Sequence, residues 1–267
     1  MTSTTPSAGS SALAACREEG RAALIGYLPV GFPTLAGSLE AIAAIVEGGV
    51  DIVEVGVPYS DPLMDGPVIQ RATETALAAG MTVDDVFTAV AASVAAGAPA
   101  YVMSYWNLIL RRGVDRFAAD LAAAGGSGVI TPDLIPDEAS EWLEAARRHD
   151  LDPVFLVAPS STTERLSVAT AACRGFVYAA STMGVTGTRA SVGDAAADVV
   201  ARTRAVTDLP VCVGLGVSNR AQAAEVARYA DGVIVGSALV RALDEGGPRA
   251  VGRLAAELAA GVREGRG

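Results

Sequence analysis

Two carboxylates occupy positions that suit proton transfer. Glu54 stands between Val53 and Val55 in an apolar run, and Asp65 follows it in a proline-rich loop beside Gly66. Burial disfavours a charged carboxyl, so we expect the pKa of Glu54 to rise toward a value useful for acid–base chemistry. Taken alone, Asp65 would be an ordinary turn residue. Paired with Glu54, it predicts a site where one carboxyl is the proton donor and the other stays ionised.

Three glycine-containing segments indicate a phosphate site. They are GVTGT (184–188), GLGVSN (214–219) and GSALV (236–240), and each follows a predicted strand. Glycines let the backbone approach an anion closely, and a helix starting at Gly236-Ser237 would present free N–H groups to it. Any one segment could hold ordinary turn glycines, but three in succession favour a phosphate-bearing ligand.

The hydrophobic pattern predicts the strands and helices that position these groups. Eight short apolar runs alternate with Ala-rich segments of helical period, as expected for buried parallel strands joined by helices. The predicted strands are 23–28, 51–56, 100–105, 128–132, 153–158, 175–180, 210–216 and 231–237. The predicted helices are 36–48, 83–96, 114–124, 137–148, 163–171, 194–206, 220–229 and 247–262.

Eight such units favour a closed (β/α)8 TIM barrel over an open doubly wound sheet. We expect a single domain over 1–267, a short helix over 11–19 at the amino-terminal end of the barrel, and flexible residues 1–10. The long connections 57–82 and 181–193 fall at the carboxyl ends of strands, where barrel enzymes carry their catalytic groups.

Composition excludes several kinds of chemistry. All 20 basic residues are Arg, so no lysine is available for a Schiff base. The formal net charge of −10 disfavours nucleic-acid and membrane partners. His149 is the single histidine and the three cysteines match no metal or redox spacing, so we expect no metal site. We expect the cysteines to be free thiols and the protein to be cytoplasmic. The Ser/Thr-rich start and the lack of an uninterrupted apolar run of spanning length lead us to expect neither a secretory signal nor a membrane-spanning helix.

With these motifs, nearly the whole chain, from Ala22 to about Leu258, resembles the tryptophan synthase alpha chain family. The motifs that carry the resemblance are GVPYSDPLMDGPVIQ (56–70) after Glu54, SYWN (104–107), PDLIPDE (132–138), GVTGTR (184–189), GLGVS (214–218) and GVIVGSALV (232–240). The resemblance implies a lyase that cleaves indole-3-glycerol phosphate to indole and glyceraldehyde 3-phosphate in tryptophan biosynthesis.

The resemblance also implies roles for individual residues. Glu54 is the general acid and base, and Asp65 binds the indole N–H and stabilises its developing positive charge. The implied phosphate-binding residues are Gly187, Gly216, Gly236 and Ser237. The implied substrate-binding residues are Tyr27, Met103, Ile130, Leu156, Tyr178, Thr186 and Leu215, although Tyr178 taken alone is equally well explained as a core tyrosine.

A partner and its cofactor are implied as well. The chain would need no cofactor of its own and would join a pyridoxal-phosphate-dependent beta chain in an allosteric α2β2 heterotetramer. Pro58, Asp61, Pro62 and Asn107 match positions at or near that interface. A free-standing, indole-releasing lyase would look similar.

Three rival functions are weaker on the residues. Indole-3-glycerol phosphate synthase resembles this chain in strand order, but it relies on a catalytic lysine that is absent here. A metal-dependent sugar-phosphate epimerase or isomerase would need a histidine cluster. A non-catalytic barrel that activates a partner has no need for both Glu54 and Asp65.

Overall fold

A computed structural model of the chain describes residues 6–180, 189–214 and 216–265. Eight parallel strands pair in the order β1 to β8, and β8 pairs again with β1 to close a barrel. This confirms the predicted barrel and rules out the open sheet. The strands are β1 (Ala23–Pro29), β2 (Ile52–Gly56), β3 (Ala100–Met103), β4 (Gly128–Thr131), β5 (Asp152–Val157), β6 (Val177–Ala180), β7 (Val211–Gly214) and β8 (Gly232–Val235).

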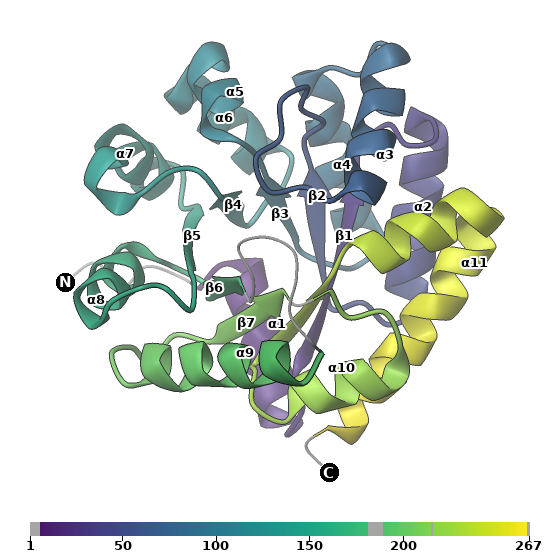
Figure 1. Cartoon of the computed structure of the whole chain (residues 1–267). Helices are drawn as coiled ribbons and strands as arrows, with labels where there is room; N and C mark the ends of the chain where they lie inside the picture. Colours follow the sequence, from purple (N-terminus) through teal and green to yellow (C-terminus); the bar gives the residue numbers. More distant parts are fainter. Residues whose placement is uncertain (1–5, 181–188, 215, 266–267) are drawn as a thin grey trace.

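Helices surround the strands (Figure 1). Besides those described below, they are α2 (Leu35–Glu47), α4 (Val83–Ala95), α6 (Val114–Ala123), α7 (Ser140–Arg148), α8 (Thr163–Ala172), α9 (Arg189–Arg204) and α10 (Arg220–Ala227). Each corresponds to a predicted helix. Among the described helices, none is by itself long and apolar enough to cross a membrane, and only one sharply bent pair, Pro67–Ala78 with Val83–Ala95, passes the same test together.

Two helices lie where the sequence predicted only connections, and a short 3-10 turn replaces the start of a predicted helix. The helices are α3 (Pro67–Ala78) and α5 (Trp106–Arg112), and the turn is η1 (Pro136–Glu138), which stands at the start of the predicted helix 137–148. Helix α3 begins at Pro67, a residue suited to the first turn, and it buries the small side chains Ala72, Thr73 and Ala76. Helix α5 has only seven residues, too few to show a period.

The last predicted helix, 247–262, is longer than expected. Helix α11 (Ser237–Glu264) starts directly after β8 and is kinked at Gly246 and Gly247, the second of which has φ +65°. The kink separates a first segment at the end of β8 from the segment that the sequence predicted. The helix therefore begins at Ser237, as the glycine pattern after β8 indicated.

The expected helix at the amino-terminal end of the barrel is α1 (Ala8–Glu18), which begins three residues before the predicted position. Ser7 caps its first turn by accepting a hydrogen bond from Ser10 N–H. Part of the segment predicted to be flexible is therefore capped and helical.

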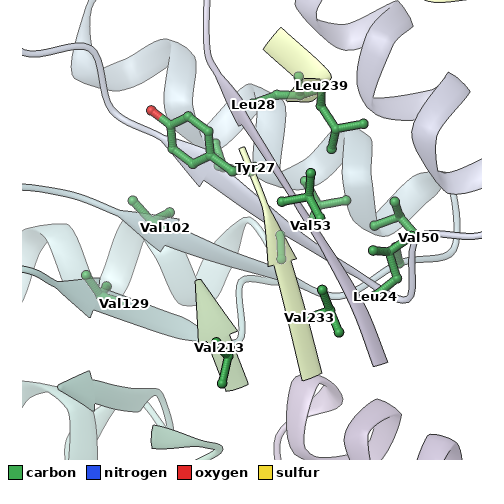
Figure 2. Packing of buried hydrophobic residues seen from close by; sticks show 14 of the residues in the cluster. Leu24, Tyr27, Leu28, Val50, Val53, Val102, Val129, Val213, Val233 and Leu239 are labelled. Carbon is green, nitrogen blue, oxygen red and sulfur yellow. The ribbon is translucent and has the colours of Figure 1, made fainter. Parts of the chain in front are cut away.

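The core has two layers, separated by the strands. Outward-facing side chains such as Leu24, Val53 and Val102 pack against the surrounding helices (Figure 2). Inward-facing side chains fill the barrel, and Leu13 and Cys16 of α1 join them at its base. This alternation fixes which strand residues can reach the interior.

Candidate active site

A cavity of about 210 Å³ lies at the carboxyl ends of the strands. A hollow of about 370 Å³ near α1 is larger, but Arg21 and Arg204 there are paired with Asp51 and Asp231. The smaller cavity is the candidate active site because it contains both predicted catalytic carboxyls, Glu54 and Asp65. It is lined by Tyr27, Glu54, Met64, Asp65, Gly66, Ile69, Met103, Leu156, Tyr178, Ala180, Gly214, Gly216, Ile234, Gly236 and Ser237.

Glu54 reaches the cavity from β2, where its register partners are Tyr27 on β1 and Tyr101 on β3. Its residue surface is only 1% exposed, and Oε2 has no hydrogen-bond partner in the described part of the chain. Burial, followed by the nearby charge of Asp65, raises the pKa of Glu54 to about 8. Glu54 is thus protonated near neutral pH and is placed to donate that proton.

Asp65 lies in the loop that precedes α3, directly before Gly66, the N-cap residue of that helix. Its side chain is partly exposed, and burial raises its pKa from the ordinary value. Its backbone carbonyl accepts a hydrogen bond of 2.8 Å from Gln70 Nε2. Because Glu54 is the more deeply buried carboxyl, a charge on Glu54 is the more costly of the two, which favours a protonated Glu54 beside an ionised Asp65.

Tyr27 and Tyr178 line the same cavity. Burial raises both pKa values well above the ordinary range, so both hydroxyls stay neutral during proton transfer at Glu54. Glycines make room for them: a Cβ at Gly56 would lie 2.4 Å from the Tyr27 hydroxyl, and one at Gly214 would lie 2.5 Å from the Tyr178 hydroxyl. The sequence analysis singled out Gly214 only for a phosphate site and Gly56 only as part of a family motif. Their contacts with the tyrosines were not predicted, although glycine in a strand is a known signal of close approach.

The end of the cavity predicted to bind phosphate is formed by Gly216, Gly236 and Ser237. Gly216 has φ +65°, which favours glycine, and Ser237 is the first residue of α11. The first helical hydrogen bond there runs from Val240 N–H to Gly236 O, so among the residues that the structure describes the preceding N–H groups of the helix have no helical acceptor and could face an anion. The other predicted residue of this group, Gly187, lies outside the described residues.

Most of the predicted substrate-binding residues fall in one place. Tyr27, Met103, Leu156 and Tyr178 line the cavity. Ile130 does not: it is fully buried in the barrel interior, where Met103, its register neighbour on β3, packs against its cluster. Thr186 and Leu215 lie outside the described residues. The cavity is also lined by residues that the sequence did not predict, since nothing in their local pattern separates them from core residues: Met64, Ile69, Ala180 and Ile234.

The residues predicted to meet a partner belong to the loop after β2 and to α5. Asp61 and Asn107 are exposed, Pro62 is half-buried and Pro58 is buried. Asn107 donates a hydrogen bond of 2.9 Å to the Tyr59 hydroxyl, which joins the loop to the helix. Leu63, not singled out before, is 78% exposed beside them.

Within 6–180, 189–214 and 216–265, no group of three or more His, Cys, Asp or Glu side chains is arranged to hold a metal ion.

Comparison with known proteins agrees with this geometry. The family model described as "Tryptophan synthase alpha chain" matches residues 13–263. The chain is 66% identical over 249 residues to the tryptophan synthase alpha chain of Mycobacterium marinum, covering 93% of this chain and 92% of that protein. It is 64% identical over 250 residues to that of Mycobacterium tuberculosis, with 94% and 92% covered.

Solved structures show the same likeness. A chain of Mycobacterium tuberculosis tryptophan synthase superposes with a TM-score of 0.92 at 60% identity, covering 97% of this chain and 99% of that chain. Tryptophan synthase subunit alpha from Legionella pneumophila gives a TM-score of 0.88 at 30% identity, with 97% and 99% covered. Since the sequence match and the fold match both span nearly the whole chain, the chain belongs to the tryptophan synthase alpha chain family.

Proposed function

We propose that Glu54 and Asp65 carry out the known reaction of tryptophan synthase alpha chains, the cleavage of indole-3-glycerol phosphate in tryptophan biosynthesis. The observation that carries the assignment is the placement of two unlike carboxyls in a cavity that also contains the start of α11. A phosphate bound at Gly236 and Ser237 would anchor the substrate with its indole ring near Glu54 and Asp65.

In the proposed reaction, Glu54 donates its proton to indole C3. The positive charge that develops on the ring is stabilised by Asp65, which accepts a hydrogen bond from the indole N–H. Glu54, now ionised, takes the proton of the adjacent glycerol hydroxyl. The bond between C3 and the glycerol carbon then breaks, its electrons return to the ring, and the hydroxyl-bearing carbon becomes the aldehyde. Indole and glyceraldehyde 3-phosphate leave, and Glu54 is protonated again.

The pKa values support this division of roles. A carboxyl with a pKa of about 8 holds a proton at neutral pH yet remains acidic enough to release it. Tyr27 and Tyr178 keep their protons, so they contribute shape and polarity to the cavity rather than charge.

The proposed partner is a tryptophan synthase beta chain. The alpha chain of this family acts without a cofactor, and pyridoxal phosphate belongs to the beta chain. The exposed face around Asp61, Leu63 and Asn107 adjoins the cavity through Met64 and Asp65, so a protein bound there would act on the loop that carries Asp65. A cytoplasmic location is part of the proposal, consistent with three cysteines that are free and buried.

The decisive measurement is indole release from indole-3-glycerol phosphate by the purified chain, with and without a beta chain. Slow release that the beta chain greatly accelerates is the expected result. Fast release without it would indicate a free-standing lyase, and no release under either condition would leave a non-catalytic barrel as the better description.

A further inference from the structure

Tyr105 is hydrogen-bonded to the loop that carries Asp65, and the reaction proposed above gives Tyr105 no role. It precedes α5 as its N-cap residue, and its residue surface is only 6% exposed. Its hydroxyl accepts hydrogen bonds from two consecutive backbone N–H groups, those of Leu63 and Met64, each at 3.0 Å. These two residues stand immediately before Asp65.

Little else restrains this part of the loop. The side chains of Leu63 and Met64 are 78% and 37% exposed, so apolar burial does not hold them. Within the described residues, their N–H groups have no other hydrogen-bond partner than Tyr105. On the far side of Asp65, the next restraint is the bond from Gln70 Nε2 to the Asp65 carbonyl. The Tyr105 hydroxyl therefore fixes the backbone on the amino-terminal side of Asp65.

Tyr105 is itself firmly placed. Its ring packs against Tyr59 with centroids 4.9 Å apart, and Tyr59 in turn accepts the hydrogen bond from Asn107. The backbone N–H of Trp106, the next residue, donates to the Asp133 carboxylate at 2.9 Å. Because the ring contact and the neighbouring backbone hydrogen bond hold Tyr105 in place, its hydroxyl can fix the position of a loop that has few other contacts.

We propose that Tyr105 is a positioning residue that holds Asp65 opposite Glu54 through its two hydrogen bonds to the loop backbone. The proposal rests on the function proposed above, because it assigns Asp65 its role at the reacting ring. Tyr105 does not line the cavity, so it acts through Asp65 rather than on the substrate.

The test compares Tyr105→Phe with the matched variant Tyr59→Phe. Both keep the contact between the two rings, but only Tyr105→Phe removes the acceptor for the Leu63 and Met64 N–H groups. The pKa of Glu54 is measured by NMR of 13C-labelled glutamate carboxyls in the substrate-free chain. Asp65 is the ionised group that faces Glu54, since Tyr27, Tyr178 and Cys212 all have raised pKa values and stay neutral.

If Asp65 moves away in Tyr105→Phe, its repulsion weakens and the pKa of Glu54 falls below about 8. An unchanged pKa, or an equal fall in Tyr59→Phe, would overturn the proposal. This measurement needs no turnover, so it separates this inference from the cleavage reaction: a chain that releases no indole refutes the proposed function and leaves the titration result standing.

Kinetic measurements give a second, independent test of the proposal. We expect Tyr105→Phe to lower kcat about tenfold with little change in KM, because the phosphate-binding end is untouched. In an Asp65→Asn background the same substitution should cost almost nothing, since the group it positions has lost its charge. A full tenfold loss in that background, with thermal unfolding unchanged, would show that Tyr105 acts independently of Asp65.

Discussion

Glu54 shows how one residue takes its reactivity from its surroundings. A glutamate in water is ionised at neutral pH, whereas Glu54 is enclosed by the barrel and faces Asp65, so its pKa rises to about 8. We expect Glu54→Gln to lower the cleavage rate by about 10²- to 10⁴-fold, because glutamine cannot transfer a proton. Binding of glyceraldehyde 3-phosphate and the thermal unfolding temperature should change little. Turnover near that of the unmodified chain would remove Glu54 from the mechanism.

The same two carboxyls predict the pH dependence of the reaction. Glu54 must be protonated and Asp65 ionised, so kcat/KM should rise on the acidic side as Asp65 loses its proton and fall as the pH passes about 8. In Asp65→Asn the acidic limb should disappear. The alkaline limb should move to lower pH, because Asp65 no longer helps to keep the proton on Glu54. An alkaline limb at the same pH in both proteins would contradict the coupling between them.

Among the elements, the start of α11 decides how the phosphate is held. We expect Gly236→Asp to raise KM at least about tenfold, because its carboxylate would repel the phosphate group at the helix N-terminus. The effect should weaken with added salt, which screens charge. Gly236→Ala is the matched control, since its Cβ would lie 3.3 Å from Tyr27 Cδ1 but adds no charge. Equal KM values for the two variants would mean that bulk, and not charge, explains the result.

At the scale of the whole molecule, a buried aspartate joins α1 to the closed end of the barrel. Asp152 is fully buried and accepts hydrogen bonds from Ser7 Oγ and, at 2.8 Å, from the Tyr101 hydroxyl. Arg174 Nε lies 3.1 Å from its other oxygen. The network joins a segment near the amino terminus to β3, to β5 and to the connection before β6, at the end opposite the active site.

We therefore expect Asp152→Asn to lower the free energy of unfolding by about 2–4 kcal/mol, since it leaves buried partners incompletely paired. Asp150→Asn is the control: Asp150 pairs with the same arginine, but its side chain is 55% exposed, so its loss should cost no more than about 1 kcal/mol. Urea denaturation measures both. Equal destabilisation, or a large change in KM for Asp152→Asn, would argue against a purely structural role at the base.

The sequence by itself determined the features that repeat or that are locally encoded. Eight apolar runs with helical segments between them specify a barrel, because parallel strands buried on both faces must be apolar throughout. Glu54 was recognisable because a carboxylate in such a run is costly to bury, and Ser237 because glycine before a helix marks an anion site.

Only the tertiary structure decided which distant groups meet. Ile130 and Ile234 both belong to the barrel interior, but the strand register, not the local sequence, lets only Ile234 line the cavity. Gly56 and Gly214 acquire their importance from tyrosines on neighbouring strands, which no local pattern reports. The Tyr105 hydroxyl reaches a backbone more than forty residues away in sequence. Such contacts depend on how the barrel closes, because closure sets which side chains from different strands share one space.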